Sequence, residues 1–124
     1  MAELDCHQLP TVVTAQVPPQ FSSSYNNDYY EYFRECLIIP KDFPREIITI
    51  VEVKFIIGCD GETTLTYIQA RGSSHHGLIT EISAAINNMP PWKPGRNKGH
   101  NVKVREHLSF TIVEGKLVEI DDHL

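Results

Sequence analysis

The clearest pattern in the sequence is the alternation of hydrophobic and polar residues from position 47 to position 70. In the stretch REIITIVEVKFII, every second residue can point to one face of a strand: Ile47, Thr49, Val51, Val53, Phe55 and Ile57. The Asp-Gly pair at 60–61 is typical of a tight turn. A second strand follows over about 62–70, with Leu65, Tyr67 and Gln69 on one face and Thr64, Thr66, Ile68 and Ala70 on the other. The pattern predicts an antiparallel β-hairpin.

Two other segments have the spacing of amphipathic helices. From about 27 to 37, Asn27 or Asp28 can cap a helix whose apolar stripe contains Tyr29, Tyr30, Phe33, Cys36 and Leu37. After a cap at Ser73 or Ser74, a second helix presents Leu78, Ile82, Ala85, Ile86 and Met89 on one face and ends at Pro90. We expect both helices to pack on the sheet, and we expect Cys36 to be a buried, inert thiol.

A third strand is expected from about 101 to 113, with Val102, Val104, Leu108, Phe110 and Ile112 toward the core. Glu106 interrupts this row and predicts a bulge or a frayed segment. The order of elements predicts an α+β fold, in which a small antiparallel sheet of about three strands packs against two helices. Residues 1–23 are interpreted as an extended lead-in, 24–114 as the folded domain and 115–124 as a tail.

Composition narrows the function classes only slightly. A chain of 124 residues predicts one domain, and a net charge of −5 with scattered basic residues argues against a nucleic-acid partner. Three cysteines at long spacings (Cys6, Cys36 and Cys59) match neither a disulfide framework nor a zinc pattern, and they do not decide the compartment. The longest apolar runs are far below the roughly 18 residues of a membrane span, so we expect no membrane contact by this segment.

Catalytic chemistry is not indicated by any motif. The pair His75-His76 beside Ser73 and Ser74 has no carboxylate or cysteine at ligand spacing nearby, so it does not predict a metal site. The PGRNKG stretch precedes a strand and not a helix, which excludes a phosphate-binding loop. We therefore expect a non-enzymatic protein without catalytic residues, cofactor or metal.

The segment MPPWKPGRNKGHNVKV, residues 89–104, resembles the signature of the C-terminal domain of TonB-family energy transducers, in the form common in Bacteroidetes. The matching positions are Met89, Pro90, Trp92, Pro94, Gly95, Gly99, Val102 and Val104, with Phe110 further on. The stretches VPPQF, YFRECLIIP and VEVKFIIGCDGETT are also similar to that family. The chain departs from it in lacking a glycine in FPREIITIVEV, in having Cys59 before the turn and in lacking a proline in the last strand. From the residues alone, Trp92 is interpreted as a buried wedge that holds the helix end on the sheet.

The resemblance implies a periplasmic peptide-binding domain. Such a domain binds the TonB-box segment of outer-membrane receptors by β-strand addition along the edge of its last strand, for energy-coupled nutrient transport. The site residues implied on this chain are Arg96, Lys98, Val102, Lys103, Val104, Arg105, His107, Ser109 and Thr111. The charged members of this set would equally suit a solvated face that protects an edge from aggregation.

A second hypothesis remains open because full-length transducers carry a membrane helix and a Pro-rich spacer that this sequence does not contain. The chain would then be a free-standing binding or regulatory protein on the same scaffold, without energy transduction: either a homodimer through an edge strand or a sensor for another partner. The first hypothesis implies a periplasmic location with an inner-membrane anchor in a longer protein. A native start at Met1 would imply the second and a cytoplasmic location.

Overall fold

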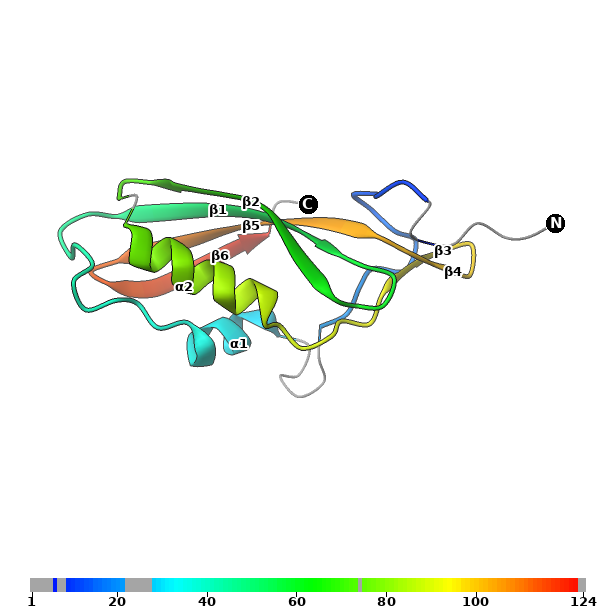
Figure 1. Ribbon diagram of the computed structural model, residues 1–124, viewed down its shortest axis with the longest axis horizontal. Helices are drawn as coiled ribbons and strands as arrows, with labels where there is room; N and C mark the ends of the chain where they lie inside the picture. The colour runs from blue at the N-terminus through cyan, green and yellow to red at the C-terminus, as the bar shows by residue number, and fades with distance from the viewer. Residues whose placement is uncertain (1–5, 7–8, 22–27, 74, 123–124) are drawn as a thin grey trace.

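The computed structural model describes residues 6, 9–21, 28–73 and 75–122. These residues form helices α1 (Tyr29–Cys36) and α2 (His76–Asn87) and the strands β1 (Thr49–Ile57), β2 (Thr63–Arg71), β3 (Gly95–Asn97), β4 (His100–Val102), β5 (Val104–Val113) and β6 (Lys116–Asp122). Four strands make an antiparallel sheet in the order β2-β1-β5-β6, and β3 and β4 make a separate hairpin (Figure 1). The predicted α+β class is confirmed, with four strands in the main sheet in place of about three.

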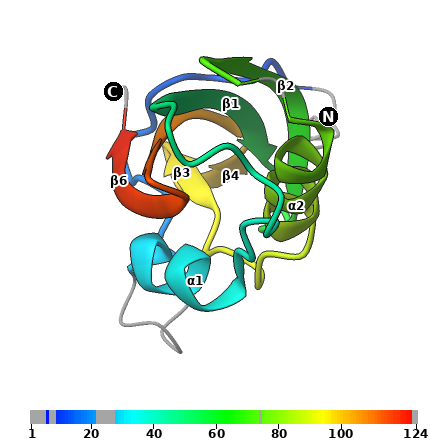
Figure 2. The ribbon, with the colours of Figure 1, turned by 90° about the vertical axis from the view of Figure 1, so that its left-hand side faces the viewer.

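The two helices lie on the same face of a strongly curved sheet (Figure 2). The alternation in β1 is confirmed, because Val51, Val53, Phe55 and Ile57 are fully buried beneath them. Their neighbours in the core are Leu78, Ile82 and Ile86 of α2, Phe33 of α1, and Leu108, Phe110 and Ile112 of β5. Since burying one such side chain contributes about 1.5–3 kcal/mol, this layer is the main source of stability.

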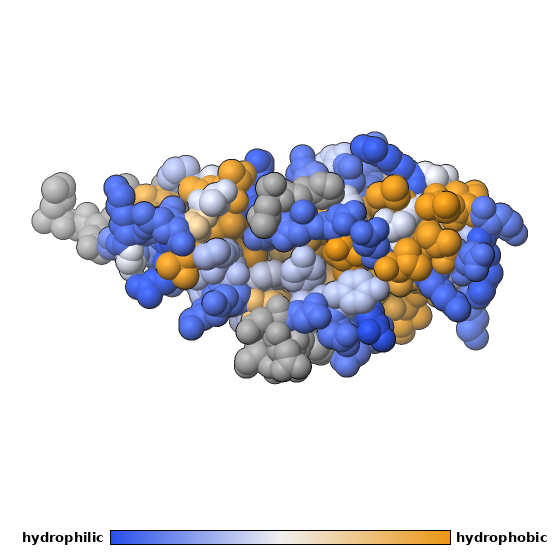
Figure 3. All heavy atoms as spheres, turned by 180° about the vertical axis from the view of Figure 1, so that it is seen from behind, coloured by the Kyte–Doolittle hydropathy of each residue, from blue (hydrophilic) through white to orange (hydrophobic). Residues whose placement is uncertain are grey.

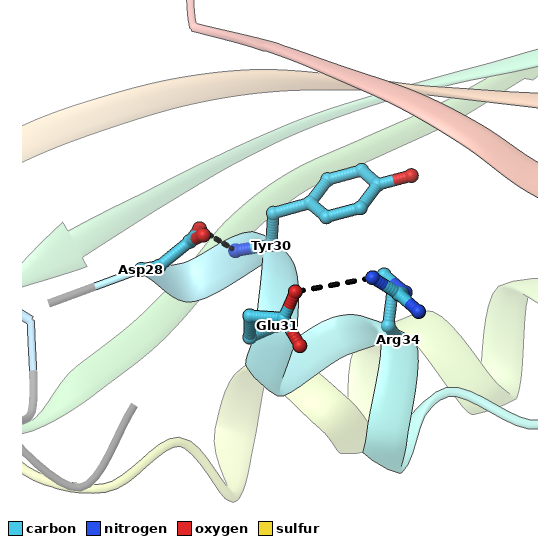
Figure 4. Close-up of polar contacts among 4 residues, drawn as sticks. All are labelled: Asp28, Tyr30, Glu31 and Arg34. Atoms are coloured by element: carbon cyan, nitrogen blue, oxygen red, sulfur yellow. Dashed lines mark hydrogen bonds and ion pairs between the residues drawn. The ribbon is translucent and has the colours of Figure 1, made fainter. Parts of the chain in front are cut away.

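Helix α1 begins where the sequence predicts, and its buried face matches the predicted stripe in part: Phe33 is buried, and Tyr29 and Leu37 pack against the core. The Asp28 carboxylate accepts a hydrogen bond from the Tyr30 N–H at 2.9 Å, and Arg34 pairs with Glu31 at 3.1 Å (Figure 4). The alternative cap, Asn27, lies outside the described residues. Tyr32 and Phe33 are the buried pair, whereas Cys36 is the last residue of the helix and is exposed. The prediction of a buried thiol was therefore wrong.

Helix α2 buries Leu78, Ile82, Ala85 and Ile86, as predicted, and Met89 follows them into the core. Its N-cap is His75 and not Ser73, because the His75 Nδ1 atom accepts a hydrogen bond from the Leu78 N–H at 3.3 Å. Ser74 lies outside the described residues. A ring nitrogen can replace the usual hydroxyl oxygen here, since it satisfies one of the free N–H groups of the first turn.

Two features of the sheet differ from the expected pattern. Lys54 pairs with Tyr67 but Phe55 pairs with Leu65, so Thr66 is an extra residue in β2. This bulge shifts the alternation, and Leu65 and Ile68 therefore both pack against the core, contrary to prediction. Glu106, by contrast, pairs with Phe55 without a shift, so the predicted bulge at Glu106 is wrong.

The segment expected to be a tail contributes the fourth strand. Residues Lys116–Asp122 form β6, which pairs with β5 after a two-residue turn at Glu114 and Gly115. Lys98 and Gly99 make a similar turn between β3 and β4. All four turn residues have positive φ angles, 52° and 74° for the first pair and 51° and 79° for the second, as two-residue hairpin loops require. The expected single strand over 101–113 is accordingly divided between β4 and β5.

Residues 9–21 of the lead-in, which we call the strap, are extended and bound to the domain. Val17 exchanges two backbone hydrogen bonds with Arg96, at 3.0 and 2.9 Å, and Gln20 exchanges two with Lys93, at 3.0 and 2.8 Å. Ala15 packs with Val102 and Val104 in a small second core. The strap therefore acts as an additional strand beside β3.

A disulfide joins Cys6 to Cys59 in the turn between β1 and β2, with the two Cα atoms 6.0 Å apart. The spacing of the three cysteines left their redox state open; the structure pairs Cys6 with Cys59 and leaves Cys36 free. The two partners are 53 residues apart in sequence and meet only because the strap returns to the hairpin turn.

The hairpin turn also fixes the position of the segment around Trp92. Gly61 has a φ of 84°, and its carbonyl oxygen accepts a hydrogen bond from the Trp92 N–H at 2.8 Å. A Cβ atom on Gly61 would lie 2.0 Å from the Trp92 carbonyl oxygen, so only glycine fits. Gly115 also has a positive φ, but a Cβ there would have its nearest neighbour at 3.6 Å.

We expect Gly61→Ala to destabilise the protein more than Gly115→Ala. Both substitutions place alanine at a positive φ angle, which costs about 1–2 kcal/mol. Only Gly61→Ala also adds a clash with the backbone, which costs about 1–3 kcal/mol more. Urea unfolding of the two variants and the parent chain measures both costs. Equal losses of unfolding free energy would contradict the close contact between the hairpin turn and Trp92.

Candidate functional site

Strand β5, the predicted peptide-binding edge, lies inside the sheet. It pairs with β1 along Val104–Ile112 and with β6 along Leu108–Val113. At its start, the strap occupies the remaining side, because Val12 bonds to the Lys103 carbonyl at 3.0 Å and to the Arg105 N–H at 2.9 Å. The expectation that β5 is an open edge is therefore wrong, and the reason is that the chain's own ends pair with it.

The nine predicted peptide-binding residues separate into three groups in the structure. Val102 and Val104 are buried in the second core with the strap. The second group is Lys103, just before β5, and four residues of β5: Arg105, His107, Ser109 and Thr111. Of these, Arg105 is exposed and Ser109 is buried. Arg96 and Lys98 lie in the β3–β4 hairpin. These residues do not form one exposed surface.

The residues of the predicted signature contribute to packing or to turns. Trp92 is 7% exposed, and its ring lies against Phe21 at 5.1 Å, Tyr29 at 6.3 Å and Phe55 at 6.2 Å between centroids. A Cβ on Gly95 would lie 2.7 Å from a Val104 methyl group, so this position also favours glycine. Met89 and Phe110 are in the core, Pro90 and Pro94 are half-buried, and Gly99 makes the hairpin turn. Trp92 is therefore the predicted buried wedge.

The open edges of the main sheet are β2 and β6, each paired on one side only within the described part of the chain. β6 has the sequence KLVEIDD, with Leu117 and Ile120 packed against the core and Val118 half exposed. Glu119 and Asp121 are exposed acidic residues on the other face of the strand, and Asp122 follows at its end. This edge is the one that the sequence reading assigned to a tail.

A pocket of about 280 Å³ opens between the strap, α1 and the end of β6. Four aromatic rings line it (Phe21, Tyr29, Phe55 and Trp92), together with the carboxyl groups of Glu106 and Asp122 and the strap residues Pro18–Gln20. We call it the aromatic–acidic pocket. Among the described residues, it lies at the interval of β5 between the Val12 bridge at Val104 and the pairing with β6, which begins at Leu108.

Burial and nearby charges raise the pKa values of two side chains in this pocket. Burial, with a further contribution from the Asp122 charge, raises the pKa of Glu106 to about 7. Burial also raises the pKa of Tyr29 to about 12, with the charges of Asp122 and Glu106 adding to the effect. The Tyr29 hydroxyl group lies 3.5 Å from the Asp122 carboxylate and donates to it. The indole N–H of Trp92 is buried and has no acceptor among the described residues.

A second hollow, the basic groove, lies on the other side of Pro18 and Gln20. It has a volume of about 350 Å³ and is lined by Gln16, Val17, Lys93, Arg96 and Lys98, among others. Arg96 donates to the Gly99 carbonyl at 2.8 Å, which holds its guanidinium group in the hairpin. Two of the predicted peptide-binding residues, Arg96 and Lys98, therefore lie in a groove formed with the strap.

The histidine pair considered above as a metal or catalytic site does not form a reactive cluster with other described side chains. His75 caps α2, and its Nε2 atom lies 3.3 Å from Asp42. Across the described residues, no three histidine, cysteine, aspartate or glutamate side chains gather as a metal site, and no helix is long and apolar enough to cross a membrane.

No family model, no curated protein and no solved structure matches this chain. The geometry described above is accordingly the basis for the proposals that follow.

We expect Glu106→Gln to change how stability depends on pH. Because the folded-state pKa of about 7 lies above the ordinary value of about 4.3, the carboxyl group favours the folded state most below pH 4.3. That contribution is lost as the pH rises toward and through 7. The free energy of unfolding, measured with urea, should fall more between pH 5 and pH 8 for the parent chain than for the variant.

The matched control is Glu119→Gln, which removes one exposed carboxylate from β6. It should leave the difference between pH 5 and pH 8 close to that of the parent chain. Parallel pH profiles for the parent chain and Glu106→Gln would contradict the buried environment of Glu106.

Proposed function

We propose that this chain is a peptide-binding domain of the TonB class that takes an extended segment at the free edge of β6. Strand addition needs a row of backbone N–H and C=O groups without partners, and β6 pairs with β5 alone among the described residues. This open side of β6 is the observation that carries the proposal. The proposed partner is the TonB-box segment of an outer-membrane receptor, in the periplasm, in energy-coupled nutrient transport.

The position of the pocket favours β6 over β2 as the docking edge. Binding by strand addition gains affinity from the backbone and selectivity from pockets for alternate side chains. Asp122, at the end of β6, lines the aromatic–acidic pocket, so a guest strand on this edge has a recess beside it. Of the pockets described above, neither includes a residue of β2.

The edge that binds can be identified by NMR. A synthetic TonB-box peptide, titrated into the chain labelled with ¹⁵N, should shift the backbone amide resonances of residues 116–122. A peptide of the same composition in scrambled order is the control. Unmoved resonances at millimolar peptide, or shifts confined to β2 or to β5, would contradict the proposal.

A second candidate is a free-standing binding protein that forms a homodimer through β6. The sequence of this strand favours self-pairing. If two antiparallel copies of β6 are centred between Val118 and Glu119, Lys116 faces Asp121 and Leu117 faces Ile120. Opposite charges and apolar pairs at facing positions each contribute about 0.2–1 kcal/mol.

We expect this candidate, if correct, to give a dimer in sedimentation equilibrium that Lys116→Glu weakens, because the substitution places like charges opposite each other. The compensating double variant Lys116→Glu with Asp121→Lys should restore it. A monomer at all concentrations up to the millimolar range would exclude the dimer and leave the peptide-binding proposal unaffected.

A further inference from the structure

The aromatic–acidic pocket has the composition of a site for a positively charged organic group. It combines the carboxyl groups of Glu106 and Asp122 with the rings of Tyr29 and Trp92. The described residues that line it include no lysine, arginine or histidine. Among the described residues, no basic side chain lines the pocket to balance the charge of Glu106.

Glu106 is the group whose charge is left without a counter-charge. Within the described part of the chain, its carboxyl group makes no hydrogen bond and no ion pair, although it lies half-buried on the core side of β5. Buried carboxylates are ordinarily paired with a cation or hydrogen-bonded, because an isolated charge is costly away from water. A bound cation would supply that partner, and a bound proton does so in its absence.

The aromatic rings favour an organic cation over a metal ion. Cations are attracted to ring faces within about 6 Å, and tryptophan gives the strongest such contact. Metal sites gather several acidic, histidine or cysteine ligands, whereas the described residues that line this pocket include only two carboxyl groups and no histidine or cysteine. The volume of about 280 Å³ is enough for a head group and a short stem.

We propose that this pocket binds an alkylammonium or alkylguanidinium group, with Glu106 and Asp122 as its charge partners and the aromatic rings around its stem. The group can belong to a free amine or to a lysine or arginine side chain of a peptide. The inference does not depend on strand addition at β6, because the pocket is formed by residues of the chain that are already in place.

Trp92 is the only tryptophan, so its fluorescence reports on the pocket directly. The full chain is titrated with n-butylammonium and with n-butylguanidinium at pH 8, and n-butanol serves as the neutral control. We expect a saturable change with both cations and none with butanol. Butanol binding as well as the cations, or no saturable change at millimolar concentration, would overturn the inference.

Variants assign the charge partners. Glu106→Gln should weaken cation binding about tenfold or more, since it removes the negative charge and keeps the shape. Glu119→Gln changes the net charge equally but lies outside the pocket, and it should bind as the parent chain does. Asp122→Asn, at the end of the sheet, gives an independent second variant with an expected loss in the same direction. Unchanged affinity in both pocket variants would overturn the inference.

The pH dependence provides a readout that a structural role alone would not give. The titratable groups that face Glu106 are Asp122 of β6 and Tyr29 of α1, and the strap residues in the pocket carry none. Cation binding should therefore strengthen from pH 6 to pH 8 as Glu106 loses its proton, and Glu106→Gln should flatten that dependence. A flat profile in the parent chain would contradict the role of Glu106.

A final comparison distinguishes the source of the cation. A short peptide with one lysine is compared with its norleucine counterpart, which has a similar stem and no charge. A preference for the lysine peptide identifies a peptide side chain, whereas binding of butylammonium without that preference identifies a free amine; both support the cation site. If cations bind but no peptide shifts the β6 resonances, the cation site stands and the proposed strand addition fails.

Discussion

Two-sided pairing of β5 is the constraint on which the rest of the molecule depends. The strand bonds to β1 on one side, and the strap and β6 divide the other side between them. This arrangement leaves β6 as the edge that we propose for docking. Among the described residues, neither neighbour pairs with β5 at Glu106. The aromatic–acidic pocket lies at that interval, between the strap and the described end of β6.

Trp92 connects this pocket to the core. Its ring contacts Phe21 of the strap, Tyr29 of α1 and Phe55 of β1, while its backbone bonds to Gly61 in the hairpin turn. Segments distant in sequence therefore meet at one rigid side chain. Aromatic pairs of this kind contribute about 0.5–1.5 kcal/mol each beyond the area they bury. The pocket wall is accordingly part of the stable core and is already formed before any ligand binds.

The sequence predicted the elements whose hydrophobic residues follow a regular period along the chain. The alternation in β1 and the apolar face of α2 were read correctly, because each is a periodic pattern with one buried side. β6 was missed, although Glu114-Gly115 followed by KLVEI was a usable hairpin signal. The bulge at Thr66 was missed because an extra residue leaves no mark in the composition. The pocket could not be predicted, since strap, α1, β1, β5 and β6 each contribute one or a few residues to it and no segment carries its pattern.

The disulfide between Cys6 and Cys59 determines how a pull on the start of the chain would travel through the fold. Without it, tension would reach the backbone hydrogen bonds of the strap first and could peel them apart one by one. With the bond intact, tension passes through the sulfur atoms into the turn between β1 and β2, and the strap carries no load. Mechanical work done at the beginning of the chain would then be delivered to the β1–β2 hairpin.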